Sequence, residues 1–495
     1  MAITARPPAQ LPARPPARPD TGTDTEAPST VIFEQHYLEC LSQASYLIGD
    51  PTTGRAVVVD PRRDASEYLR SAEHHNLTIE LVIETHFHAD FLSGHLELAR
   101  ATGAQIGFGD VAEAEFPHRK LAHGERIDLG KVTLEIRHTP GHTPESISIV
   151  VWEHPDDPDT PGAVPFGVLT GDTLFIGDVG RPDLLASFGV TADELGRMLH
   201  DSLHNQLLTL PDDTKVFPAH GAGSACGKQL STETVSTIGA QRADNYALAD
   251  MTVEQFLDVV TEGQPAAPGY FSYDATLNRL DREVFDESAT SPQLDAGQFF
   301  ALRDDGAMVL DTRDGTIFAA GHLVGSVNVA LDGRFAEYAG SVARPDDRIV
   351  LVTEPGDEAA ARVRLARIGF DNVIGALADP YGVMNAHPEE VRRASRLTAA
   401  EFLDRQANVA DLTVIDVRTH GEVQLGSVEG ADIVPVARLR EEMDKLAGHA
   451  DRPVVVFCAG GYRSSLAASL LRANGFTDVS DVLGGYTAVV AHLPT

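Results

Sequence analysis

Short apolar runs alternate with turn residues over residues 30–250, and helical patterns lie between some of these runs. Runs of Val, Ile and Leu that end at Gly, Pro or Asp predict buried strands. Segment 91–103, FLSGHLELARATG, instead has its apolar residues at helical spacing. The alternation predicts an α/β fold built in layers. The strand-like runs include RAVVVDP (55–61), IELVIETH (79–86), VTLEIRHTPGHT (132–143) and SISIVVW (146–152).

An internal repeat occupies the C-terminal part of the chain. LDAGQFFALRDDGAMVLDTR (294–313) and LTAAEFLDRQANVADLTVIDVR (397–418) both give a helix start and then a strand ending in Asp-x-Arg. Each copy continues with a strand and a helix that ends in Gly-Phe. The repeat predicts two small α/β domains, residues 293–388 and 396–495, with one larger domain as the alternative. Residues 251–292 are less regular and predict a connector that packs on the first domain.

Composition and charge narrow the function classes. The length of 495 residues is enough for about three domains. A formal net charge of -34 argues against a nucleic-acid partner or an anionic membrane, because both require a basic surface. Three cysteines lie far apart with no paired spacing, which is typical of a reducing compartment.

The N-terminal residues 1–29 are Pro-rich and predict a disordered or polyproline-like tail. They lack the apolar stretch of a secretory signal. No apolar run is long enough for a transmembrane helix. These features together lead us to expect a cytoplasmic protein.

Metal-ligating residues recur in turns that follow apolar runs. Neutral imidazoles and carboxylates are ligands for zinc or iron, and several such elements in order favour a metal site over isolated histidines. The elements are His86-x-His88-x-Asp90, His142 in HTPGHT, Asp172 in TGDTLF and His220 in PAHG.

In these elements, residues 30–250 resemble the metallo-β-lactamase superfamily, which implies an αββα sandwich with the metal at one edge of its sheets. Dinuclear hydrolases of that superfamily need a further His directly after the Asp, where this chain has Phe91. The first site would use His86, His142 and Asp172, with His88 as a fourth ligand or a neighbour. Two His and one carboxylate with open positions match the facial triad of non-haem Fe(II) oxygenases. Asp90 and His220 would then stand behind the ligands, and Phe91 favours a single-metal, oxygen-using site.

The strings GDTLFIGDVGRPDL (171–184) and HGAGSACGK (220–228) make the chain similar to the persulfide dioxygenases. That resemblance implies one Fe(II) per chain on His86, His142 and Asp172, and oxidation of a low-molecular-weight thiol persulfide by O2 to sulfite. Arg181 is a candidate for binding a substrate carboxylate, with a structural salt bridge as the alternative. Cys226 is a candidate for holding sulfur near the iron, with a small buried residue as the alternative. For Cys40 we expect a structural role.

CAGGYRSS (458–465) follows the strand PVVVF and precedes a helix. Backbone N–H groups of such a loop and the helix N-terminus favour the thiolate form of Cys458, and Arg463 adds a cation. A thiolate there can attack a sulfane sulfur and carry it as a persulfide. The segment resembles the rhodaneses, which implies a sulfur-binding loop with Cys458 and Arg463 as catalytic residues. The other loop members are Ala459, Gly460, Gly461, Tyr462 and Ser464.

The first repeat has Thr353-Glu-Pro-Gly-Asp-Glu358 at the corresponding place and no cysteine, so we expect an inactive rhodanese-like domain. The whole chain resembles the bacterial persulfide dioxygenase–sulfurtransferase fusions. That resemblance implies sulfide detoxification, with thiosulfate formed from sulfite by the rhodanese, and we expect a homo-oligomer. A glyoxalase II-like thioester hydrolase and a sulfur carrier with only the rhodanese active are the alternatives. The thiol carrier and the direction of the rhodanese step stay open.

Overall fold

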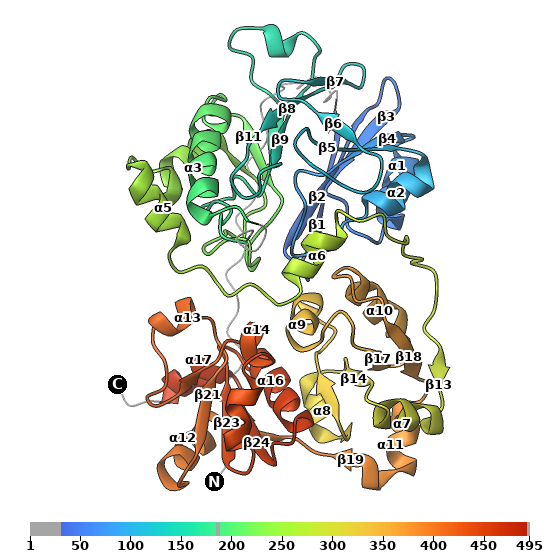
Figure 1. The fold of residues 1–495 in the computed structure, drawn as a ribbon, viewed down its shortest axis with the longest axis vertical. Coiled ribbons are helices and arrows are strands. Elements are labelled where there is room, and N and C mark those ends of the chain that lie inside the picture. The colour runs from blue at the N-terminus through green and yellow to red at the C-terminus, as the bar shows by residue number, and fades with distance from the viewer. Residues whose placement is uncertain (1–30, 185–188, 493–495) are drawn as a thin grey trace, which may run out of the picture.

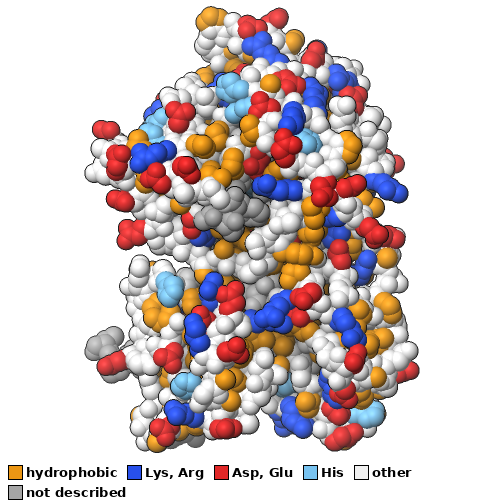
Figure 2. Space-filling model, viewed as in Figure 1, with side chains coloured by type: hydrophobic (Ala, Val, Ile, Leu, Met, Phe, Trp, Pro, Cys, Tyr) orange, Lys and Arg blue, Asp and Glu red, His pale blue; other side chains and the backbone are white. Residues whose placement is uncertain are grey.

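The computed structural model describes residues 31–184 and 189–492, so the predicted N-terminal tail lies outside the described residues. Two layers of strands form the upper half of the molecule in Figure 1, and two smaller α/β units lie below them. Acidic and basic side chains are intermixed on the face drawn in Figure 2. None of the helices among the described residues is long and apolar enough to cross a membrane.

The N-terminal domain contains two six-stranded sheets. The sheet orders are β1-β2-β3-β4-β5-β6 and β12-β11-β10-β9-β8-β7. The strands are β1 (Ile32–Leu38), β2 (Gln43–Asp50), β3 (Arg55–Val59), β4 (Thr78–Ile83), β5 (Gln105–Gly109), β6 (Arg119–Leu121), β7 (Arg126–Asp128), β8 (Thr133–His138), β9 (Ile147–Trp152), β10 (Gly167–Gly171), β11 (Lys215–Pro218) and β12 (Ser236–Thr237). Apolar side chains of both sheets pack against each other between the two layers, and this cluster is the core of the domain.

Helices cover the outer face of each sheet. A second apolar cluster joins β2, β3 and β4 to α1 (Ser66–His74) and α2 (His95–Thr102). A third joins β9, β10 and β11 to α3 (Ala192–Ser202), α4 (Ile238–Asp244) and α5 (Val253–Thr261). The layers are therefore helix, sheet, sheet, helix, which confirms the predicted αββα fold.

Helix α2 begins at His95, four residues later than the start of the predicted helical segment 91–103. The backbone N–H of Leu92 donates to the carbonyl of Arg367, and the side chain of Asn278 accepts from the N–H of Ser93. These contacts with distant segments hold residues 91–94 out of the helix.

The connector adds α6 (Phe271–Leu277), which lies between the N-terminal domain and the first rhodanese-like unit (Figure 1). Arg367, just after α10 (Glu358–Ala366), pairs with Asp64 at 2.6 and 2.8 Å. The same guanidinium donates to Cys40 Sγ at 3.4 Å. Cys40 is therefore part of a contact between domains, consistent with the structural role expected for it. The predicted boundaries at residues 250, 292 and 388 stay predictions.

The two C-terminal units each contain a five-stranded sheet, and the pairs within each sheet are parallel. The orders are β13-β18-β17-β14-β16 and β20-β24-β23-β21-β22. Because parallel strands end at one edge, the loops after the central strands meet there.

The first unit and its short β-ribbon contain β13 (Gln293–Leu294), α7 (Ala296–Asp304), β14 (Met308–Asp311), α8 (Gly315–Ala320), β15 (His322–Leu323), β16 (Ser326–Asn328), α9 (Phe335–Val342), β17 (Ile349–Val352), α10, β18 (Val373–Leu377), α11 (Pro380–Ala386) and β19 (Val391–Arg392). The second contains β20 (Ser395–Leu397), α12 (Ala399–Asn408), β21 (Thr413–Asp416), α13 (His420–Gln424), β22 (Asp432–Ile433), α14 (Val436–Leu439), α15 (Met443–Leu446), β23 (Pro453–Phe457), α16 (Tyr462–Ala473), β24 (Asp478–Val482) and α17 (Gly485–His492). Side chains of both units and of the N-terminal domain share one large apolar cluster, so the domains pack on one another.

Candidate active sites

Three side chains meet at one edge of the paired sheets. His86 follows β4, His142 follows β8, and Asp172 directly follows β10. His86 Nε2 lies 3.9 Å and His142 Nε2 lies 3.5 Å from Asp172 Oδ2. One ligand atom from each residue falls within 4.8 Å of the others, and all three residues are buried. The spacing of these atoms suits a single metal ion.

Hydrogen bonds turn both imidazoles toward that point. His142 Nδ1 lies 2.9 Å from the carbonyl oxygen of Arg181, which leaves Nε2 free for a ligand. His86 Nδ1 lies 2.9 Å from the Thr85 hydroxyl, and this hydroxyl donates to Asp60 at 2.8 Å. Such partners fix the orientation of metal-binding histidines. Burial, followed by the neighbouring His88, lowers the pKa of His86 well below its usual value, which favours the neutral ligand form.

Two of the converging atoms, His86 Nε2 and Asp172 Oδ2, are buried without a hydrogen-bond partner. An unpaired buried polar atom is costly, so each such atom requires an explanation. A divalent cation bound by two imidazoles and a carboxylate would pair these atoms, and this donor set is one that iron or zinc accepts. The residues present therefore fit a metal.

His220 connects this site to Asp90. Its Nδ1 lies 2.8 Å from Asp172 Oδ1 and its Nε2 lies 2.7 Å from Asp90 Oδ2. Burial lowers the pKa of His220, but the charges of Asp172 and Asp90 outweigh it and raise this pKa well above the usual value. Burial likewise opposes ionisation of Asp172, yet the charge of His220 holds the pKa of this carboxyl well below its usual range. His220 thus holds one oxygen of Asp172 and leaves the other toward the histidines.

His88 faces away from the three candidate ligands. Its Nε2 lies 3.1 Å from Asp60 Oδ1 and 3.3 Å from Glu84 Oε2. Burial lowers the pKa of His88, but Asp60 and Glu84 raise it to about 10. A charged imidazole between two carboxylates is a neighbour rather than a fourth ligand. Sequence reasoning missed Asp60 and Glu84, although both are charged residues that close strand-like apolar runs.

Phe91 is fully buried and lies in the large apolar cluster between the domains. Its ring centroid lies 4.3 Å from that of His88. The cluster around it includes Phe175, Tyr270, Phe271, Phe335 and Phe370. The position after Asp90 is thus part of the packing between domains.

Protein groups occupy most of the N–H donors of Arg181. It pairs with both carboxylate oxygens of Asp183 at 2.6 and 2.7 Å. It also donates to the carbonyl oxygens of Pro265, at 2.6 Å, and Ala225, at 3.2 Å. This arrangement favours the structural salt bridge over binding of a substrate carboxylate, because protein groups take four of the five N–H donors.

Cys226 lies on the loop that Arg181 holds. The N–H of Arg181 donates to the carbonyl of Cys226 at 3.0 Å. Its thiol falls within 4.8 Å of ligand atoms of Asp90 and His220. Burial and then Asp90 raise the pKa of the Cys226 thiol well above its usual value. The structure therefore places a buried cysteine directly behind the candidate metal centre.

The second site is the loop between β23 and α16. Gly461 adopts a φ of 103° and its N–H donates to Cys458 Sγ at 3.0 Å. The Ser464 hydroxyl lies 3.6 Å from the same sulfur. Sequence reasoning missed Gly485, at which a Cβ would overlap the carbonyl of Cys458. The adjacent pair of glycines in LGGYT was the available signal.

Other loop residues make contacts outside the loop. The Arg463 guanidinium pairs with both carboxylate oxygens of Glu422 at 2.6 and 2.8 Å. Burial opposes ionisation of Glu422, yet Arg463 lowers the pKa of this carboxyl to about 2. The Tyr462 hydroxyl donates to the carbonyl of Ala330 in the first unit at 2.7 Å. Glu422 was also missed, because nothing in the sequence near α13 indicates that it approaches Arg463.

Comparison with known proteins agrees with this arrangement. The Metallo-beta-lactamase superfamily profile matches residues 38–152, and the Rhodanese-like domain profile matches residues 295–379 and 398–492. A mitochondrial persulfide dioxygenase of Bos taurus is 28% identical over 260 residues, which cover 51% of this chain and 90% of that protein. A hydroxyacylglutathione hydrolase of Hyphomonas neptunium is 30% identical over 242 residues, covering 46% of this chain and 86% of that protein.

A crystal structure of a metallo-beta-lactamase from Staphylococcus aureus subsp. aureus COL is also similar. Its TM-score is 0.62 at 33% identity, and the match covers 70% of this chain and 98% of that one. The chain belongs to the metallo-beta-lactamase superfamily and carries two rhodanese-like domains. The predicted domain types are therefore confirmed.

Proposed function

We propose that the chain oxidises a low-molecular-weight thiol persulfide with O2 to sulfite and thiol, and that Cys458 then transfers a sulfane sulfur to sulfite to give thiosulfate. The observation that carries the first half is the convergence of His86, His142 and Asp172 with two buried, unpaired donor atoms. Phe91 supports a single-metal site, because it removes a ligand that a second metal would need. The persulfide dioxygenase relative supports the choice of substrate.

His86, His142 and Asp172 would hold one Fe(II), which supplies the capacity to activate O2 toward a bound sulfur anion. Around it, His220 keeps Asp172 ionised and oriented. Thr85 and the carbonyl of Arg181 keep the two imidazoles turned toward the same point. The overall reaction balances as RSSH + O2 + H2O giving RSH, SO3²⁻ and two protons, with sulfur oxidised and oxygen reduced.

In the second half, the thiolate of Cys458 attacks the sulfane sulfur of a second persulfide. A new S–S bond forms on Cys458, and the donor thiolate leaves with the electron pair of the broken bond. The sulfur of sulfite then attacks the outer sulfur of Cys458, which forms thiosulfate and returns the cysteine thiolate. The N–H of Gly461 faces Cys458 Sγ and supports the anionic forms. The net outcome would be sulfide detoxification.

Oxygen uptake tests the proposal directly. Anaerobically iron-loaded protein is given a small-thiol persulfide, and sulfite and thiosulfate are quantified after oxygen is admitted. We expect oxygen consumption with thiosulfate as the accumulating product. Oxygen uptake without thiosulfate would contradict the rhodanese half, and no uptake with one iron bound would contradict the dioxygenase half.

The hydroxyacylglutathione hydrolase relative supports a second candidate, cleavage of a glutathione thioester. Thioester cleavage without oxygen uptake, by protein loaded with zinc or with two metals, would favour it. Transfer by Cys458 alone, with iron bound and neither other reaction, would favour a sulfur carrier.

Asp172→Ala tests the ligand assignment without reference to activity. We expect the variant to fold and to lose its iron, measured as metal per chain after dialysis. The exposed Asp213→Ala is the matched control and should keep iron. Full iron content in Asp172→Ala would contradict the assignment.

A further inference from the structure

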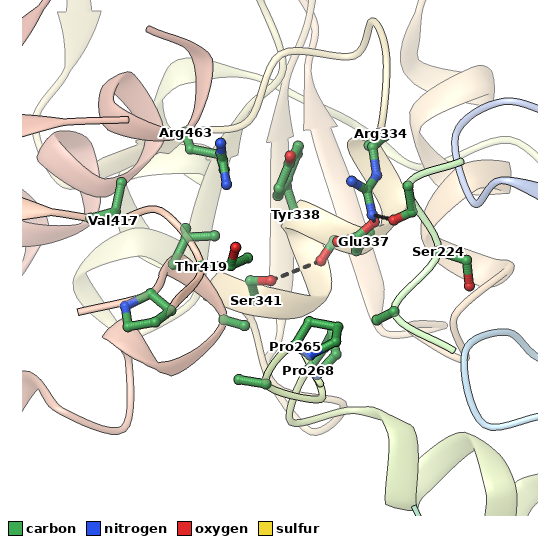
Figure 3. Close-up of a pocket in the computed structure, with 16 residues that line it drawn as sticks. Ser224, Pro265, Pro268, Arg334, Glu337, Tyr338, Ser341, Val417, Thr419 and Arg463 are labelled. Atoms are coloured by element: carbon green, nitrogen blue, oxygen red, sulfur yellow. Dashed lines mark hydrogen bonds and ion pairs between the residues drawn. The ribbon is translucent and has the colours of Figure 1, made fainter. Parts of the chain in front are cut away.

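A cavity of about 100 Å³ lies where four segments of the chain meet (Figure 3). The segments are the 223–225 loop of the N-terminal domain, the connector around Pro265, helix α9 of the inactive rhodanese-like domain, and the region of Arg463 in the active one. We call this cavity the transfer chamber. Neither catalytic domain forms it alone, because the inactive domain supplies the wall between them.

One end of the chamber is lined by the loop that leads to Cys226. Ser224 and Ala225 line it, and the next residue is Cys226, beside Asp90 and His220. Arg181 holds this loop through its contacts with Ala225 and Cys226. The loop also accepts a hydrogen bond at the Gly223 carbonyl from Arg334, which begins α9. Arg181 and Arg334 therefore hold the 223–226 loop in place from two directions.

The other end adjoins the sulfur-transfer loop. Arg463, five residues after Cys458, extends into the chamber, and Thr419 lines the wall beside it. Tyr338 of α9 lies between Arg463 and Arg334 in Figure 3. Its ring centroid lies 5.2 Å from that of Tyr462 in the sulfur-transfer loop. Helix α9 thus contacts residues on the approach to both catalytic centres.

The charges and the size of the chamber suit a small anion. Arg334 and Arg463 bring two guanidinium groups to its wall, each paired with one carboxylate. Burial raises the pKa of Glu337, the carboxyl that pairs with Arg334. At about 100 Å³ the chamber has room for a four-atom oxyanion.

A larger hollow of about 670 Å³ adjoins the chamber. The two share Gly223, Ser224, Pro265 and Thr419 in their walls. A hollow of this size is in the range that accommodates small organic ligands. A thiol carrier fits this wider hollow, and the smaller chamber beside it has room for the oxyanion.

We propose that the transfer chamber holds a sulfur oxyanion of the sulfite class between the metal centre and Cys458, so that the product of oxidation is consumed before it reaches bulk solvent. This inference rests on the proposed function and adds the route that connects its two halves. It also gives the inactive domain a role, since α9 forms the shared wall.

Isotope dilution tests the route with the full-length, iron-loaded protein. Unlabelled persulfide and O2 are supplied with bulk ³⁴S-sulfite at about 0.1 mM, and ³⁴S in the sulfonate position of thiosulfate is measured by mass spectrometry. A product retained near its consumer has an effective concentration on the order of 1 mM, so we expect enrichment about tenfold below that of the bulk pool. Enrichment equal to the bulk pool would overturn the inference. The Cys458→Ser variant gives the background from direct reaction of persulfide with sulfite.

Filling the chamber gives a second test. Ala266→Phe places a ring in it, and Ala437→Leu adds a smaller group at a different wall position. We expect either substitution to raise the ³⁴S enrichment toward the bulk value while oxygen uptake and transfer from thiosulfate to cyanide stay unchanged. The control is Ala473→Phe, in a cleft of about 520 Å³ elsewhere between the two rhodanese-like domains, which should leave enrichment low. Low enrichment in both filled variants, with unchanged half-reactions, would overturn the route.

The two half-reactions separate the possible failures. If the unmodified protein shows no oxygen uptake, or no sulfur transfer from thiosulfate to cyanide, the proposed function and this inference both fail. If both half-reactions run at normal rates and thiosulfate is labelled as fully as the bulk sulfite, the inference about the chamber fails and the proposed function stands.

Discussion

The two rhodanese-like domains share one frame but differ in the loop at its centre. Both sheets have the same strand order, and both central strands end in Asp-x-Arg. In each domain the Arg pairs with the carboxylate two residues earlier, through the same set of contacts. The Arg also donates to the carbonyl of a glycine, Gly321 in one domain and Gly426 in the other. The buried ion pair therefore belongs to the frame rather than to the chemistry.

The loops after β17 and β23, which occupy the same place in the two domains, differ completely in sequence. After β23 the chain gives Cys458 with the Gly461 N–H directed at its sulfur. After β17 it gives Thr353 and then Glu354, whose carboxylate accepts from Tyr381 at 2.6 Å. Acidic side chains there would repel a thiolate or sulfite. The same fold therefore forms with and without a cysteine at this place, because different residues determine the fold and the loop.

The largest expected effect comes from Cys458→Ser. We expect transfer from thiosulfate to cyanide to fall by at least about 10³-fold, because the nucleophile is removed. Oxygen uptake by the iron-loaded variant should persist, since the metal residues belong to another domain. Loss of oxygen uptake in a folded variant would contradict the independence of the two sites.

The Asp–Arg ion pair that both rhodanese-like domains contain predicts an equal loss of stability when it is removed from either domain. Asp311→Asn and Asp416→Asn each leave a buried guanidinium without its carboxylate, which should cost about 3–5 kcal/mol of domain stability. A three-domain chain does not unfold in one step, so the measurement is hydrogen exchange of peptides from β14 and β21. Each substitution should speed hydrogen exchange in the domain that contains it more than in the other rhodanese-like domain. Unchanged protection from hydrogen exchange in both variants would contradict a role for the ion pair in stabilising the fold.

Low pH should destabilise the domain that carries Cys458, because it protonates Glu422. Its folded pKa of about 2 lies below the ordinary value of 4.5, so the ionised carboxylate stabilises the fold above about pH 4.5. This stabilisation is lost as the pH falls from 4.5 toward 2. Cleavage of the full chain by pepsin within residues 419–473 should accelerate over this range. Glu422→Gln should reduce the pH dependence, whereas the exposed Glu429→Gln should leave it unchanged.

The smallest effect is expected from adding a cysteine to the first rhodanese-like domain, which we expect to be inactive. Thr353→Cys, made in the Cys458→Ser background, should leave cyanide-dependent transfer at background. The new thiol would lie beside Glu354, Asp357 and Glu358 rather than in a loop that directs N–H groups at it. Transfer clearly above background would show that the frame alone supplies the chemistry.

Local patterns were enough to predict the type of each domain. Apolar strand runs, the repeat and the Asp-x-Arg ends predict layered α/β domains, because burial and backbone pairing act on short segments. CAGGYRSS predicts the sulfur-transfer loop for the same reason, since its geometry depends on adjacent residues and the helix after it. Positions after strand-like runs marked a larger set of metal-ligating residues, and the resemblance to the superfamily selected His86, His142 and Asp172, which the structure brings together.

Side-chain directions and distant contacts could not be predicted in this way. His88 has ligand spacing, yet it turns to Asp60 and Glu84. Arg181 lies in a motif-like loop, yet Asp183 and two carbonyls occupy its donors. Glu422 reaches Arg463 from 41 residues away. The longer-range pairings depend on which segments pack together, and even the local pairs, Arg181 with Asp183 and His88 with Glu84, depend on the direction that the fold gives each side chain.

The sequence by itself determined that this protein has one domain of the metallo-β-lactamase type and two rhodanese-like frames, only one of which carries a cysteine. It did so because strand periodicity and loop motifs act over neighbouring residues. Only the tertiary structure decided that Phe91 packs between domains, that Cys226 lies near Asp90 and His220, and that α9 lines a cavity together with the 223–225 loop and Arg463. Such placements arise from apolar burial among segments far apart in the chain, which local patterns do not specify.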